Sequence, residues 1–310
     1  MSRLKRSEFL WVGLRLLFTG VVVFFLIRTI STRWSQVVTF PWQIRLLPLA
    51  ASLAFQLIAA LFWATIWQQM VRRMDCQLGW ADGIRIHALS NLVKYIPGSI
   101  WGYASRLYWG LEIGLNVVPM GISVIWETGI TVVASLLLTA VVIPTYPSKL
   151  PQTLSLFLWM IAGLCFVGLL PPVSAQWMRI FRKHASYKAL HLGWRDFFLY
   201  LFFAICTHIL VGTAFFLFTY SLLNVDLHLL LSFIGVWSLA ATAGLVVVIA
   251  PHGLGVKEGV LVLLLQSFMP FEAALAVSLA SRLWTIAGEL INAATALAVS
   301  CLLRSVRNNS

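Results

Sequence analysis

Long apolar stretches dominate the hydropathy pattern of the chain. An α-helix rises about 1.5 Å per residue, so about 20 apolar residues are needed to cross a hydrocarbon layer about 30 Å thick. Six stretches reach that length and predict six full membrane spans in an all-α polytopic protein. They are Phe9–Ile27, Leu46–Met70, Val117–Ile143, Thr153–Pro171, Phe197–Leu223 and Phe271–Ser300.

Two further apolar regions are interrupted near their middle. Residues 84–109 contain a Pro-Gly pair at 97–98, and residues 227–268 contain a proline and two glycines within 251–255. A break exposed to lipid would leave backbone groups without hydrogen bonds, so such breaks persist only inside protein or beside water. We therefore expect two broken or re-entrant helical hairpins.

The order of these elements predicts an inverted repeat. Residues 1–148 and residues 149–310 each run span, span, hairpin, span, and Pro97 and Pro251 lie 154 residues apart. Three crossings are an odd number, so the second half begins on the opposite side and its hairpin enters from the other face. Inverted repeats with broken helices are typical of transporters with a site near the midplane. The alternative is a duplication without transport, in which the prolines only kink helices.

Composition and charge support a membrane protein. The chain is 60% hydrophobic and 10% charged, with a formal net charge of +12 and a mean hydropathy of +0.90. In a polar chain this charge would favour a nucleic-acid partner, but here we expect none. With an inner N-terminus, 13 of the 22 Lys and Arg residues fall in inner segments and 4 in outer ones. The positive-inside rule then predicts a multi-pass protein of the cell (inner) membrane with both termini cytoplasmic.

Charged residues also occur at membrane depth, where each costs about 2.5–3.5 kcal/mol. They must therefore be paired or line water. Glu127 and Arg282 lie at equivalent places in the two closing spans, so we expect them to form an ion pair across the repeats. Glu289 lies two turns after Arg282 on the same face. The alternative is that these charges only hold helices together.

The residues around the two breaks predict a site for an anionic group. Gly253 and Gly255 lack a Cβ, so their backbone amides can face a ligand, and the helix that follows adds its positive N-terminus. Lys257 adds a mobile cation, and Glu258 follows it. We expect a phosphate or carboxylate to bind here. In the first hairpin, Lys94 and Arg106 offer cations that can receive the same group from the other face.

The motifs at the two breaks resemble a known family. Lys94-Tyr95-Ile96-Pro97-Gly98 with Arg106, and Pro251-His252-Gly253-Leu254-Gly255-Val256-Lys257-Glu258-Gly259, are similar to the paired signatures of flippase-like integral membrane proteins. That family is related to the transmembrane domain of lysylphosphatidylglycerol synthases. The chain departs from it at His252, where glycine is usual, at Lys257, where arginine is common, and at Thr128, where arginine often follows the glutamate.

The resemblance implies translocation of a lipid between leaflets. We therefore expect a flippase for an anionic phospholipid or a polyprenyl-phosphate-linked lipid, with the membrane lipid as its partner. Two alternatives stay open: a membrane-embedded lipid-modifying transferase with Glu127 or Glu258 as general base, and an accessory subunit that does not transport. The sequence shows no nucleotide motif or Ser/His/Asp arrangement, so we expect no enzyme activity. The four cysteines show no CxxC spacing, and we expect neither a metal nor a cofactor.

Overall fold

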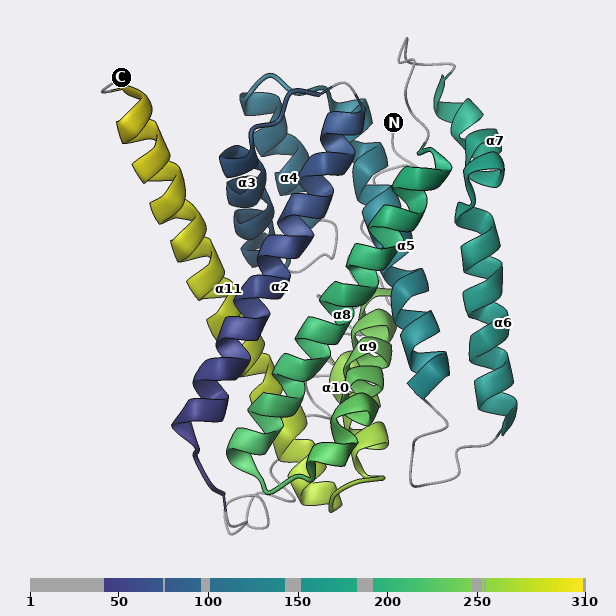
Figure 1. Cartoon of the computed structure of the whole chain (residues 1–310), viewed down its shortest axis with the longest axis vertical. Coiled ribbons are helices and arrows are strands. Elements are labelled where there is room, and N and C mark those ends of the chain that lie inside the picture. The colour runs from purple at the N-terminus through teal and green to yellow at the C-terminus, as the bar shows by residue number, and fades with distance from the viewer. Residues whose placement is uncertain are drawn as a thin grey trace, which may run out of the picture.

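The computed structural model describes residues 42–74, 76–95, 101–142, 152–182, 192–246, 253 and 255–308. Every element in this part of the chain is a helix (Figure 1). In chain order the elements are α2 (Leu46–Arg73), α3 (Trp80–Val93), α4 (Trp101–Glu112), α5 (Val117–Val142), α6 (Gln152–Leu169), α7 (Pro171–Arg182), α8 (Trp194–Leu222), the 3-10 turn η2 (Leu227–Leu229), α9 (Leu230–Val246), α10 (Val256–Leu265) and α11 (Phe271–Asn308).

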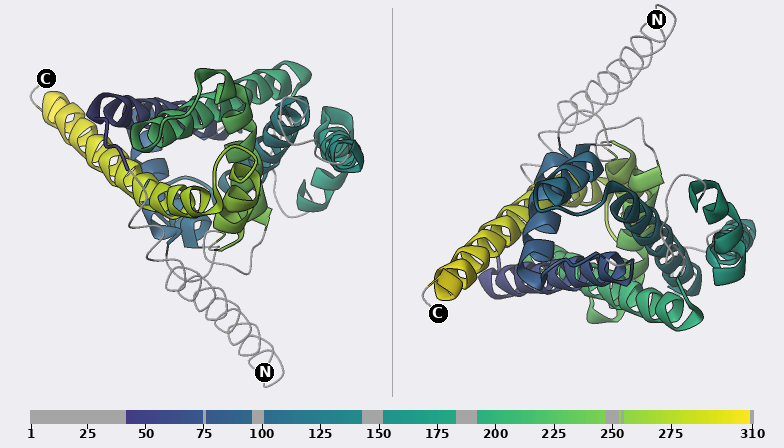
Figure 2. Two further views of the ribbon diagram at one scale, coloured as in Figure 1. Left: turned by 90° about the horizontal axis from the view of Figure 1, so that it is seen from below. Right: turned by 90° about the horizontal axis from the view of Figure 1, so that it is seen from above.

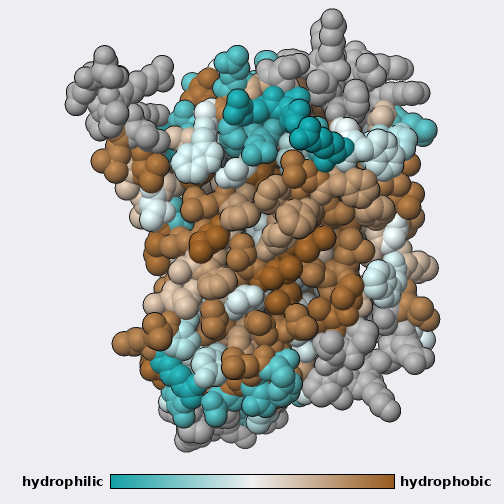
Figure 3. Space-filling view, viewed as in Figure 1, coloured by the Kyte–Doolittle hydropathy of each residue, from teal (hydrophilic) through white to brown (hydrophobic). Residues whose placement is uncertain are grey.

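Five stretches of helix are long and apolar enough to cross a membrane: α2, α5, α8, residues 227–245 and residues 271–302. An apolar band covers the middle of the molecule, and polar side chains gather at both ends (Figure 3). The protein is therefore an all-α, multi-pass membrane protein. The expected span Phe9–Ile27 lies outside the described residues, whereas α6 occupies the expected span Thr153–Pro171.

Two helix pairs occupy the places expected for the hairpins. Helix α3 packs against α4, and α9 packs against α10. The first pair lies toward the end where α2 finishes, and the second pair lies toward the opposite end (Figure 1). The second pair is unequal, because α9 together with η2 is long enough to span on its own whereas α10 has 10 residues. The division into inverted repeats at residues 148 and 149 stays a prediction.

Small and aromatic residues hold the second hairpin in the bundle. Helices α8 and α9 approach closely at Gly212, where a Cβ would lie 2.6 Å from the Ile234 Cα. Beside this contact, the rings of Phe215 and Trp237 pack at a tilt of 35°, with 4.8 Å between their centroids. Trp284 of α11 closes the same cluster. Lipid tails are as apolar as these side chains, so close packing through small residues supplies much of the association between membrane helices.

Helix α11 ties the two ends of the molecule together. It crosses from the end of α10 to the end where α2 finishes (Figure 1) and packs against α2, α3 and α10. Its Trp284 indole donates to Ser52 of α2 at 3.0 Å. Helices α6 and α7 stand at the periphery beside α5 (Figure 2). The contacts of α11 with both hairpins bring their charged residues within reach of one another.

Candidate functional site

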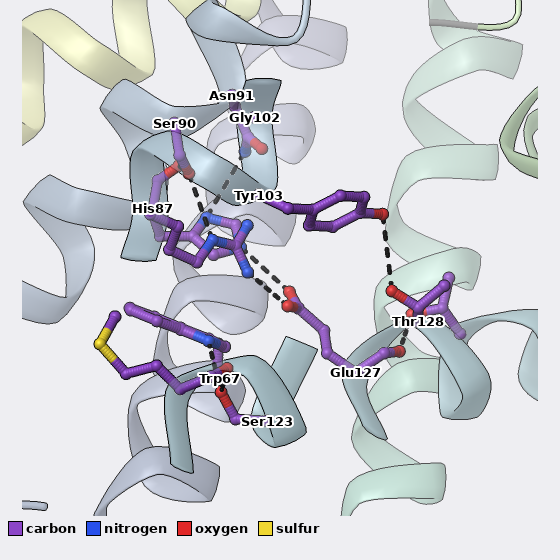
Figure 4. Close-up of polar contacts among 12 residues, drawn as sticks. Trp67, His87, Ser90, Asn91, Gly102, Tyr103, Ser123, Glu127 and Thr128 are labelled. Carbon is purple, nitrogen blue, oxygen red and sulfur yellow. Dashed lines mark hydrogen bonds and ion pairs between the residues drawn. The ribbon is translucent and has the colours of Figure 1, made fainter. Parts of the chain in front are cut away.

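The first cluster of buried charges lies between α3, α4 and α5. Arg106 of α4 donates through Nη1 to Glu127 Oε2, and its Nε lies 3.3 Å from Ser90 Oγ of α3. His87 Nε2 lies 3.2 Å from the other Glu127 oxygen. The Arg106 guanidinium stands 4.9 Å above the Trp67 ring. These side chains converge in Figure 4, and both charged residues are almost fully buried, at 4% exposure for Arg106 and 6% for Glu127.

This cluster corrects the partner expected for Glu127. The predicted ion pair between Glu127 and Arg282 is wrong, because Glu127 pairs with Arg106 and His87 while Arg282 pairs with Glu258. The physical reason is the fold of the first hairpin, which returns α4 along α3 and delivers Arg106 to the adjacent helix α5. His87 of α3 is also buried within this cluster.

The second cluster lies at the start of α10. Glu258 Oε2 accepts a hydrogen bond from the Gly255 backbone N–H at 2.7 Å, and Oε1 accepts one from Arg282 at 2.6 Å. A glutamate at the third helical position that reaches back to the capping residue closes the first turn of a helix. The Gly255 amide is therefore occupied by Glu258, which corrects the expectation that it faces a ligand.

The two glycines of the second break have a different structural use. Gly253 and Gly255 have φ values of 63° and 82°, in the left-handed region that favours glycine. A Cβ at Gly253 would also lie 2.6 Å from the carbonyl oxygen of Gly244 in α9. Both positions thus let the chain turn tightly against α9 and aim the start of α10 into the bundle.

Helix α11 connects the two hairpins through charged contacts. Lys94, just after α3, places Nζ 2.5 Å from Glu289 Oε1. The ring of Tyr95 lies 6.0 Å below the Arg282 guanidinium, which pairs in turn with Glu258 of α10. The elements that approach from opposite ends of the molecule therefore share one network, with α11 between them.

Lys257 differs from the other cations of this network. Its Nζ lies 3.8 Å from the centroid of the Trp237 ring in α9. Lys94, Arg106 and Arg282 each pair with a carboxylate, whereas no carboxylate in the described part of the chain pairs with Lys257. Its charge still lies within electrostatic range of Lys94, Arg282, Glu258 and Glu289. The Lys257 side chain is half-buried.

The structure thus sorts the predicted site residues into two groups. Lys94, Glu289, Arg282, Glu258 and Gly255 form a continuous network with Lys257 beside it, while Arg106 and Glu127 form a separate buried cluster. The sequence did not predict the contacts that His87, Trp67 and Trp237 make with charged residues. A tryptophan in an apolar span gives no signal that it faces a cation. Among the residues described, no three His, Cys, Asp or Glu side chains gather as metal ligands.

Comparison with known protein families gives one match along almost the entire chain. The family described as the lysylphosphatidylglycerol synthase TM region matches residues 11–304. The match includes both hairpins, both charged clusters and all five apolar helices. No curated protein matches this sequence.

Proposed function

Because the chain belongs to the family of the lysylphosphatidylglycerol synthase transmembrane region, we propose that it moves a lipid with an anionic head group between the leaflets of the membrane. The lipid is an anionic phospholipid or a polyprenyl-phosphate-linked lipid. Its head group passes through the charged interior, and its tail stays in the bilayer. The lipid is not altered chemically, so the proposed activity is transport and not catalysis.

The observation that carries this proposal is the set of contacts made by the Lys257 ammonium. A cation at membrane depth costs about 2.5–3.5 kcal/mol unless an anion or water offsets it. The neighbouring cations form ion pairs with Glu289 and Glu258, whereas Lys257 lies over the Trp237 ring and forms no ion pair with a carboxylate of the described residues. A phosphate oxygen that enters beside Trp237 would supply the missing counter-charge.

The Lys94–Glu289 ion pair, on the other side of the network, is a suitable second binding position for the head group. The Lys94 and Glu289 side chains are 22% and 13% exposed, so water or a head group can compete for them. The Arg106 and Glu127 side chains are only 5% and 7% exposed. We therefore assign Lys94 to the lipid path and Arg106 to positioning of the first hairpin.

The same proposal includes the location and orientation of the chain. The excess of Lys and Arg in the segments expected on the same side as the N-terminus supports a location in the cell (inner) membrane with both termini cytoplasmic. A head group that leaves the inner leaflet would then meet the first hairpin before Lys257.

Transport is tested with the purified full-length chain in vesicles that carry fluorescent phosphatidylglycerol. A membrane-impermeant quencher reports how fast the labelled lipid exchanges between leaflets. We expect the protein to accelerate exchange, Lys257→Gln to reduce the acceleration at least about tenfold, and Lys257→Arg to keep most of it. Arg85→Gln is the matched control, because it removes a cation whose partner Asp82 lies at the protein surface. Equal rates for Lys257→Gln and the unmodified protein would refute the assigned site.

The enzyme and accessory alternatives give different outcomes in the same vesicles. Mass spectrometry of the recovered lipid separates them, since transport changes the location of the lipid and leaves its mass unchanged. A new lipid mass would establish a transferase. Absence of accelerated exchange from the purified chain, restored by a copurifying protein, would establish an accessory subunit.

A further inference from the structure

The outer face of α2 carries a series of hollows that the transport path does not use. An apolar hollow of about 300 Å³ lies between α2 and α8 and is lined by Leu61, Phe62, Thr65, Ile66, Gln69 and Phe203. A polar hollow of about 440 Å³ continues from it and shares Thr65 and Gln69. A third, of about 710 Å³, shares Arg72 with the second. Shared lining residues join the three into one surface groove, here called the α2 groove.

The α2 groove changes from apolar to cationic along its length. Its lower part exposes Leu61 and Phe62, and the Phe62 ring lies 6.1 Å from that of Phe203 across the gap between the helices. Its upper part is lined by Arg72, Arg73 and Trp80. Figure 3 shows the same change on this face, from brown over the middle of the molecule to teal where α2 ends.

Of the two arginines at the upper end, one pairs with a carboxylate of the described residues. Arg73 Nη2 lies 3.2 Å from Asp196 Oδ1 of α8, so its charge is largely balanced. Arg72 is exposed and forms no ion pair with a carboxylate in the described residues. The Trp80 indole N–H donates a hydrogen bond to Thr65 Oγ1 at 3.3 Å. This bond fixes an aromatic ring at the boundary between the apolar and the cationic part of the α2 groove. Tryptophans are enriched at this depth of a membrane.

The length of the α2 groove matches one leaflet. Leu61 and Arg72 are 11 residues apart on the same helix, which is about 16 Å at helical rise. Half of the hydrocarbon layer is about 15 Å thick. A head group at Arg72 would therefore place its acyl chain along Phe62 with the terminal methyl group near the bilayer midplane.

We propose that the α2 groove binds one anionic phospholipid from the leaflet on the Arg72 side. Arg72 holds the phosphate, Gln69 and Trp80 flank the glycerol region, and one acyl chain lies between α2 and α8. The exposed Arg72 guanidinium favours a head group with one net negative charge over a zwitterionic head group, whose amine it would repel. This site lies on the membrane-facing surface and goes beyond the proposed transport, since it holds whether or not the lipid is moved.

Binding is tested on the full-length chain with Lys257→Gln in place, so that the central cation does not contribute. Native mass spectrometry compares the retention of phosphatidylglycerol with that of phosphatidylethanolamine. We expect phosphatidylglycerol to bind about fivefold more tightly, as one surface arginine is worth about 1 kcal/mol against an anionic lipid. Arg72→Gln should abolish that preference. Leu61→Trp should fill the apolar part and reduce the retention of both lipids.

Arg45→Gln is the matched control, because it removes an arginine at the opposite end of α2, where Arg45 contacts Gln43 and Asn224. It should leave the preference unchanged. The proposal is overturned if the two lipids bind equally to the starting protein, or if Arg72→Gln keeps the preference. Loss of the preference in Arg45→Gln and Arg72→Gln alike would also overturn it, because the effect would then follow net charge.

Discussion

The two hairpins place basic residues at membrane depth in different ways. In the first, Arg106 is enclosed by Glu127, His87, Ser90 and Trp67, and every charged atom of the group lies inside the protein. In the second, Glu258 accepts a hydrogen bond from the Gly255 amide and pairs with Arg282, while the Lys257 ammonium lies over the Trp237 ring. The first arrangement fixes helices, whereas the second leaves a cation for a ligand.

This difference predicts that Arg106 contributes mainly to stability and Lys257 mainly to ligand binding. A fully buried pair is costly to break because the remaining charge has no water around it. Removing the charge of a half-buried cation that lies over an aromatic ring is expected to change the free energy of unfolding little. The first hairpin is therefore expected to dominate the stability of the bundle, and the second to dominate its activity.

The largest effect on stability is expected from Glu127→Ala. It leaves Arg106 buried without its carboxylate, which should cost about 3–5 kcal/mol of unfolding free energy. Unfolding of the purified chain in mixed detergent measures the change. The double variant Arg106→Leu with Glu127→Leu should recover most of the loss, because it removes both charges together. A loss below about 1 kcal/mol in Glu127→Ala would show that the pair is solvated.

The next largest effect is expected from Gly253→Ala. The new Cβ would meet the Gly244 carbonyl in a backbone conformation with positive φ, and overpacking of this kind costs about 1–3 kcal/mol. Gly259→Ala is the matched control, because it lies in α10 with open space around its Cβ position. It should be neutral or stabilise the helix by up to about 1 kcal/mol. Similar losses in both variants would show that the turn at Gly253 is not tightly packed.

A smaller effect is expected for the link between the first hairpin and α11. Lys94 and Glu289 are partly exposed, so their coupling should be about 0.5–1 kcal/mol. A double-mutant cycle with Lys94→Ala and Glu289→Ala isolates that value. A coupling near that of a buried pair, about 3 kcal/mol or more, would remove Lys94 from the lipid path and make both hairpins structurally alike.

The sequence predicted the helices and the positions of the breaks better than the partners of the charges. Apolar length and prolines depend on local chemistry, so α2, α5, α6, α8 and α11 follow the expected spans. Ion pairing depends on which helices are neighbours. The equivalent positions of Glu127 and Arg282 suggested a pair, but the return of α4 brought Arg106 to Glu127 first. The cap formed by Glu258 had a signal in the Gly-Val-Lys-Glu spacing at residues 255–258, which is that of a capping box.

The smallest effect on stability is expected at Lys257 itself, and it tests most directly whether the two hairpins use their charges differently. Lys257→Gln removes a cation–π contact worth about 0.5–2 kcal/mol. It also removes the cost of keeping at membrane depth an ammonium that forms no ion pair within the described residues. The two terms oppose each other, so the unfolding free energy should change by less than about 1 kcal/mol. The same detergent titration used for Glu127→Ala measures it. Trp237→Leu is the informative control, since it removes the aromatic face and leaves the charge, and it should destabilise the chain more than Lys257→Gln does. If Lys257→Gln instead costs as much as Glu127→Ala, Lys257 is a structural cation, and the two hairpins use their charges in the same way.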